Sequence, residues 1–206
     1  MKEPSTETLR LFAAVAIPEW VREEMARVQG ELRPFTAPGD VRWTKPEQLH
    51  LTLKFLGDVP ANAVEALKKS MAEACAGVRP FHLRARGIGF FPDSRSPRVI
   101  WVGFEGNENG LADLQTRVER ALAPFAEKPG AEKFRAHATL GRFQKFRRHK
   151  TEKLLPRASA LGGHVFGEWQ AKEVGLFRSE LSPDSARHTS LAAFPLAGKI
   201  EPTETL

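Results

Sequence analysis

Short apolar runs alternate along this chain with stretches in which apolar residues recur every three or four positions. The runs have the length of β-strands, whereas steps of three and four residues follow one face of an α-helix. Helices are predicted in this way over residues 18–32, 58–75 and 109–125. Strands are predicted over residues 9–17, 41–43, 50–56, 80–91, 99–104, 134–143, 171–177 and 188–196.

The order of these elements indicates the fold class. The strands at 80–91 and 99–104 flank a segment rich in Pro, Asp and Ser, so we expect them to form a hairpin. A regular alternation of strand and helix is missing, which favours an α+β protein over a parallel βαβ fold. We expect one domain over residues 9–196, with flexible ends at 1–8 and 197–206.

One tetrapeptide pattern occurs in two of the predicted strands, as His50-Leu51-Thr52-Leu53 and as His137-Ala138-Thr139-Leu140. Residues two apart in a strand point to the same face. Each copy therefore presents an imidazole and a hydroxyl on one face and apolar side chains on the other. The two halves of the chain resemble a degenerate duplication.

Two His-Thr pairs that meet across a groove would form an acid–base site. Histidine has an unperturbed pKa near neutrality, so one imidazole can accept a proton while the other donates one. Each threonine can donate a hydrogen bond to a phosphoryl oxygen, and Arg142 or Lys54 near the strand ends can balance its charge. The motifs fix no carboxylate, and a histidine metal site would need ligands that the chain does not specify. This chemistry suggests in-line displacement at a phosphodiester without metal.

The composition of the chain indicates its cellular location and the kind of molecule that it binds. The chain has 206 residues and a formal net charge of +6, which favours a polyanion such as RNA. No apolar run has the length of a membrane span, and the polar start lacks the pattern of a signal peptide. The single cysteine, Cys75, excludes an internal disulfide. We expect a cytoplasmic monomer without an obligate protein partner, and a basic run at residues 145–150 that either tracks phosphates at the cleft mouth or forms a solvated loop.

At the two motifs the chain resembles the two-histidine (2H) phosphoesterase superfamily, and within it the RNA 2′,3′-cyclic phosphodiesterases, also called 2′-5′ RNA ligases. The resemblance extends from about residue 9 to about residue 196. It rests on residues 11–18, Trp43, residues 50–57, 98–103, 137–142 and 176–181.

The resemblance implies a bilobal fold in which two antiparallel sheets line a central cleft, with helices packed outside. It implies hydrolysis of RNA or nucleotide 2′,3′-cyclic phosphates to 2′-phosphomonoesters, with 2′-5′ ligation of RNA ends in some members and no cofactor. By family analogy His50 is the proton donor and His137 the proton acceptor, although the nearly symmetric motifs leave this assignment open. Thr52, Thr139 and Arg142 would bind the phosphate.

The chain departs from the family pattern beside the second histidine and near its C-terminus. Ala136 and Ala138 replace a proline and a β-branched residue, and no tyrosine occurs around His188. The remaining histidines, His188 included, lack the motif context and are expected to be structural or solvated. Two alternatives stay open: a 2H enzyme for another diester, such as a 2′-5′ linkage or ADP-ribose 1″,2″-cyclic phosphate, and a non-catalytic RNA-binding module.

Overall fold

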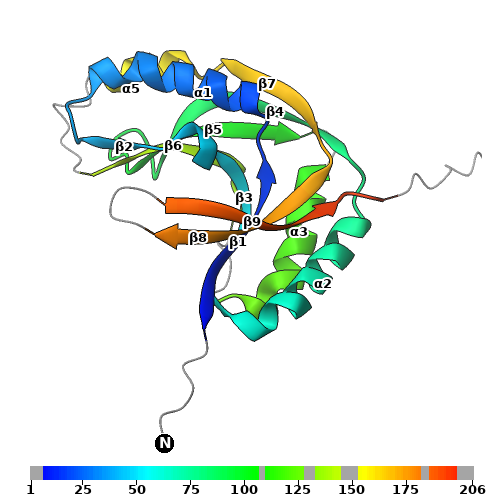
Figure 1. Ribbon diagram of the computed structural model, residues 1–206. Helices are drawn as coiled ribbons and strands as arrows, with labels where there is room; N and C mark the ends of the chain where they lie inside the picture. The colour runs from blue at the N-terminus through cyan, green and yellow to red at the C-terminus, as the bar shows by residue number, and fades with distance from the viewer. Residues whose placement is uncertain (1–6, 107–109, 128–132, 145–152, 182–185, 199–206) are drawn as a thin grey trace, which may run out of the picture.

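The computed structural model describes residues 7–106, 110–127, 133–144, 153–181 and 186–198. Their strands form two antiparallel sheets, one of four strands and one of five. Figure 1 shows helices on the outer sides of both sheets. The predicted α+β class with two antiparallel sheets is confirmed. The basic run at residues 145–150 lies outside the described residues.

The four-stranded sheet has the order β3-β1-β8-β9. It contains the first motif strand, which pairs with β1 so that Ala16 is opposite His50 and Ala14 is opposite Thr52. The bounds of its strands are His50–Pro60 (β3), Thr8–Ala16 (β1), Glu173–Leu181 (β8) and Ala186–Pro195 (β9).

The five-stranded sheet has the order β2-β6-β5-β4-β7. It contains the second motif strand, which pairs with β5 so that Gly103 is opposite His137 and Trp101 is opposite Thr139. The predicted hairpin of β4 and β5 is present. The bounds are Val41–Trp43 (β2), His137–Phe143 (β6), Val99–Gly106 (β5), Phe81–Phe91 (β4) and Val165–Ala171 (β7).

Each sheet is covered by a helix that follows a strand of the other sheet. Helix α1 (Glu19–Leu32) follows β1 but packs against β7, beside α5 (Leu154–Ala160). Helix α3 (Gly110–Leu122) follows β5 but packs against β3, beside α2 (Val64–Ala76). Both halves thus contain a strand, a helix that crosses over and a motif strand, which agrees with the expected duplication (Figure 1). Short 3-10 helices occur at Arg33–Phe35, Pro46–Gln48, Ala61–Ala63 and Ala123–Phe125.

The sequence pattern missed α5 and β7, and it placed one strand across the boundary of β7 and β8. Helix α5 carries a proline and buries only Leu154 and Ala158, so its apolar stripe is too short to show a helical period. Strand β7 buries only Phe166 and Ala171. Both elements lie at the outer side of the fold, where fewer apolar positions are needed.

The motif strands turn their apolar residues toward the core. Leu51, Ala138 and Leu140 are fully buried, and Leu53 is nearly so. Because side chains alternate along a strand, this burial directs the histidines and threonines of both motifs to the opposite face. The hydrophobic core therefore sets which way the polar side chains point.

Candidate active site

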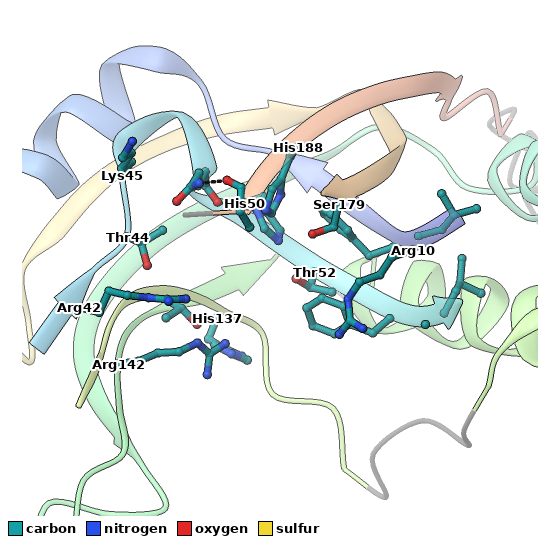
Figure 2. A pocket seen from close by; sticks show the side chains of 18 of the residues that line it. Arg10, Arg42, Thr44, Lys45, His50, Thr52, His137, Arg142, Ser179 and His188 are labelled. Atoms are coloured by element: carbon teal, nitrogen blue, oxygen red, sulfur yellow. Dashed lines mark hydrogen bonds between the residues drawn. The ribbon is translucent and has the colours of Figure 1, made fainter. Parts of the chain in front are cut away.

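A cleft of about 760 Å³ lies between the two sheets and takes residues from both. The four-stranded sheet contributes residues of all its strands, and the five-stranded sheet contributes residues of β2 and β6. In Figure 2, His50 and Thr52 lie on one wall and His137 and Arg142 on the other. The structure brings together both His-Thr pairs and the arginine predicted from the sequence, namely His50, Thr52, His137, Thr139 and Arg142.

Both motif histidines are held by the same local contact. Nδ1 of His50 lies 2.7 Å from the carbonyl oxygen of Gln48, and Nδ1 of His137 lies 2.7 Å from that of Arg135. A carbonyl oxygen only accepts hydrogen bonds, so in each imidazole Nδ1 carries the proton. Within the described part of the chain, Nε2 of neither ring has a hydrogen-bond partner. Nε2 is therefore the nitrogen that can exchange a proton with a substrate.

Aromatic rings support the two imidazoles differently. The ring of Phe12, itself almost fully buried, stacks on His50 with a centroid distance of 4.6 Å. The ring of Phe91 meets His137 at 89° with a centroid distance of 4.8 Å. Phe12 thus belongs to the core and also forms part of the cleft floor beneath His50.

The cleft keeps both imidazoles neutral while no substrate is bound. Burial, together with smaller contributions from the neighbouring His188 and His137, lowers the pKa of His50 to about 4, against the opposing hydrogen bond to Gln48. Burial also lowers the pKa of His137, with a contribution from the Arg142 charge. Desolvation penalises the charged form of a base, so both rings start as proton acceptors.

A buried glutamine on α1 fixes the second motif strand. Nε2 of Gln29 donates to the carbonyl oxygens of Leu140 and Thr44, both at 2.8 Å. The Thr44 amide also donates to the Leu140 carbonyl at 2.8 Å. Helix α1, which follows β1 of the four-stranded sheet, thereby holds the middle of β6, three residues after His137. Sequence reasoning missed this residue, because Gln29 lies on the apolar stripe of a helix and nothing local marks its partners.

The suggestion that Lys54 balances substrate charge is wrong. Lys54 is 4% exposed and forms an ion pair with Glu119 of α3, on the core side of β3. In the pairing with β1, Ala14 is opposite Thr52 and Ala13 is opposite Lys54, so Leu53 has no partner. This bulge adds one residue and reverses the alternation. Lys54 therefore points away from the cleft.

His188 lies in the cleft, contrary to the expectation of a structural or solvated residue. It is on β9 opposite Ser179 of β8, and both line the cleft. Its ring lies 5.2 Å from that of His50 and 4.9 Å from that of Phe12, measured between centroids (Figure 2). Burial lowers the pKa of His188 as well. A single histidine without a motif gives no sequence signal of this position, which depends on the strand order of the sheet.

The remaining described histidines lie outside the cleft. His164 pairs with Glu24 of α1 at 2.7 Å, and His82 is exposed on β4. Both agree with the predicted structural or solvated role, while His149 lies outside the described residues. Among the residues that the structure describes, no three His, Cys, Asp or Glu side chains are grouped in a way that could hold a metal ion.

Comparison with known proteins places the chain in a family. The family model described as LigT like phosphoesterase matches residues 15–101 and 104–187, and each stretch contains one His-x-Thr motif. The RNA 2′,3′-cyclic phosphodiesterase of Thermus thermophilus is 36% identical over 200 residues, covering 93% of this chain and 92% of the relative. The one of Methanothermobacter thermautotrophicus is 32% identical over 188 residues, covering 91% and 99%.

Solved structures agree with these sequences. A Thermus thermophilus crystal structure superposes with a TM-score of 0.76 at 31% identity, covering 93% of this chain and all of the other. E. coli LigT complexed with 3′-AMP superposes with a TM-score of 0.72 at 25% identity, covering 92% and 99%. No described helix combines the length and hydropathy needed to cross a membrane. Fold, twin motifs and relatives agree, and the chain belongs to the LigT-like phosphoesterase family.

Proposed function

We propose that this protein hydrolyses 2′,3′-cyclic phosphates on RNA ends or nucleotides to 2′-phosphomonoesters by metal-free general acid–base catalysis. The observation that carries the proposal is the matched pair of imidazoles, each with Nδ1 held by a backbone carbonyl and Nε2 left for the substrate. Relatives that align over most of the chain are named RNA 2′,3′-cyclic phosphodiesterases, which supports the substrate.

In the proposed reaction, a water molecule attacks phosphorus opposite the 3′ oxygen. Nε2 of His137 takes a proton from this water as its oxygen bonds to phosphorus. The bond from phosphorus to the 3′ oxygen breaks, and Nε2 of His50 gives that oxygen a proton. The product carries a 2′-phosphate and a 3′-hydroxyl, and proton exchange with solvent restores both histidines.

The negative charge of the bound phosphate allows His50 to become protonated and to act as the proton donor. With a pKa of about 4 in the empty cleft, His50 is uncharged at neutral pH and carries no proton on Nε2. A bound phosphate brings a negative charge next to the ring, which favours the imidazolium and raises its pKa. Thr52 and Thr139 would donate hydrogen bonds to the non-bridging oxygens, and Arg142 would neutralise their charge.

The same arrangement can use a hydroxyl in place of water. A 5′-hydroxyl of a second RNA end would then attack phosphorus, and departure of the 3′ oxygen would leave a 2′-5′ linkage. We include this ligation in the proposal, since it needs the same proton transfers at the same atoms. The proposal further takes the protein as a cytoplasmic monomer that needs no cofactor or protein partner.

A substrate panel with product analysis tests the proposal. It contains 2′,3′-cyclic nucleotides, an RNA with a cyclic end, a 2′-5′ dinucleotide and ADP-ribose 1″,2″-cyclic phosphate. We expect release of 2′-phosphates, and no 3′-phosphates, from the 2′,3′-cyclic compounds by protein treated with EDTA. Cleavage of another diester alone would favour the first alternative, binding without any turnover would favour the RNA-binding module, and loss of activity that a divalent ion restores would overturn the metal-free mechanism.

A further inference from the structure

Two arginines face each other across the strand pair β2 and β6 on the cleft wall. Arg42 and Arg142 are Cα partners in the antiparallel register, and both are exposed and line the cleft. Like charges directly opposite each other on neighbouring strands destabilise a sheet. Within the described residues, neither guanidinium forms an ion pair with a carboxylate. Lys45, three residues after Arg42, also lines the cleft and adds a third cation.

The other end of the cleft has both a cation and acidic residues. Arg10 of β1 has Asp58 of β3 as its Cα partner, and both line the cleft together with Glu127. In Figure 2, Arg10 lies on one side of the histidines, and Arg42, Lys45 and Arg142 lie on the other. The cleft therefore has a basic end and an end of mixed charge.

The mixed end also carries an exposed aromatic ring. Phe55 is 62% exposed, lines the cleft and lies 5.8 Å from Phe12 between ring centroids. Because the bulge at Leu53 shifts the alternation by one residue, Phe55 is the next side chain after Thr52 that points to the cleft face of the first motif strand. An exposed ring in a groove is a surface on which a nucleobase can stack.

We propose that Arg42 and Lys45 form a second phosphate subsite, which binds the phosphodiester on the 5′ side of the terminal nucleotide. This inference rests on the proposed function, which places the reacting phosphate between His50 and His137. Arg142 lies on the same strand as His137 and serves the reacting phosphate. Arg42 is on the neighbouring strand β2, directly opposite Arg142, so its long side chain is available to a neighbouring phosphate of the same RNA strand.

The subsite makes the length of the substrate matter. A mononucleotide 2′,3′-cyclic phosphate has only the reacting phosphate, so it leaves Arg42 and Lys45 without a ligand. An oligonucleotide with the same end supplies a second anion, and one charge-assisted contact changes binding by about tenfold. The protein should therefore act on the ends of RNA strands in preference to free nucleotides.

The test compares kcat/KM for uridine 2′,3′-cyclic phosphate and for a tetranucleotide that ends in the same group. We expect wild type to favour the tetranucleotide by about tenfold or more, and Arg42→Gln to lose about tenfold on the tetranucleotide but less than about twofold on the mononucleotide. Arg84→Gln is the matched control, because Arg84 is an exposed cation of β4 paired with Glu168 outside the cleft. This control should leave both substrates unchanged.

A neutral methylphosphonate at the last internucleotide linkage identifies the phosphate. It should remove the preference in wild type and have no further effect in Arg42→Gln. If the tetranucleotide is cleaved with the same kcat/KM whether that linkage is charged or neutral, the subsite is refuted while the proposed function stands. If neither cyclic substrate is cleaved, the proposed function fails, and the subsite, which rests on it, fails with it.

Discussion

His50 and His137, from opposite sheets, share one orientation: Nδ1 of each donates to the carbonyl oxygen two residues earlier, at 2.7 Å in both cases. The two motifs thus share the same local geometry, and both histidines have the same tautomer. Since the local contacts are equal, any difference in the roles of the two histidines comes from their surroundings. Phe12 and His188 surround His50, whereas Phe91, Trp101 and the Arg142 charge surround His137.

Replacing either motif histidine should nearly abolish catalysis. General acid–base catalysis contributes about 10² to 10⁴ in rate, so His50→Ala and His137→Ala should each reduce kcat/KM on a 2′,3′-cyclic nucleotide by about 10²-fold or more. His82→Ala is the control, since His82 is exposed outside the cleft. Near-normal turnover of either motif variant would exclude that histidine from proton transfer.

The assignment of donor and acceptor can be tested with a better leaving group. A cyclic substrate with sulfur in place of the 3′ oxygen needs little help from an acid, because a thiolate departs more readily than an alkoxide. Measured with this substrate, His50→Ala should recover most of its lost activity, and His137→Ala should not. Recovery by His137→Ala alone would reverse the two roles.

The lowered pKa of His50 should make stability depend on pH. In the folded protein the pKa is about 4 instead of 6.5, so between these values the unfolded chain binds the proton more readily. Stability is therefore full above pH 6.5 and declines as the pH falls to 4, by about 3 kcal/mol in total. Urea unfolding at pH 7 and pH 4 should show a loss in wild type that exceeds the loss in His50→Gln by up to this amount.

A variant of His188 tests one cause of the lowered pKa of His50. The charge of a protonated His188 disfavours protonated His50, so His188→Asn should raise the pKa of His50 in an NMR titration. An unchanged titration would show that His188 does not act on His50.

Gln29 should contribute to stability through its two hydrogen bonds. Gln29→Met keeps the length of the side chain but cannot donate to Leu140 and Thr44, so we expect a loss of about 2 kcal/mol in urea unfolding. Gln29→Glu should lose more, because its carboxylate would face two carbonyl oxygens in a buried position. Equal stability of Gln29→Glu and wild type would contradict the bonding seen here.

The ion pair of Lys54 and Glu119 should respond unequally to the loss of each partner. The Lys54 side chain is 1% exposed and that of Glu119 is 32% exposed. Glu119→Ala leaves a buried ammonium unpaired and should cost about 3 kcal/mol, whereas Lys54→Met leaves a carboxylate that water can reach and should cost less. Neither change should alter the KM for a cyclic nucleotide by more than about twofold. A large rise in KM for Lys54→Met alone would restore Lys54 as a substrate ligand.

The sequence by itself determined most of the helices and strands and the two His-Thr pairs of the site. Alternation along a strand is a local property of the backbone, so the spacing of His50 and Thr52, and of His137 and Thr139, was enough to place each pair on one face. The apolar stripes of α1, α2 and α3 were long enough to show a helical period. The α+β class and the family followed from these patterns, and both are confirmed.

Only the tertiary structure decided which residues join the pairs in the cleft. The bulge at Leu53 depends on the pairing with β1, and it sends Lys54 to the core and Phe55 to the cleft. His188 reaches the site because β8 places β9 beside the cleft, and Arg42 faces Arg142 only through the pairing of β2 with β6. These positions follow from contacts between segments far apart in the chain, and the pattern of neighbouring residues carries no record of them.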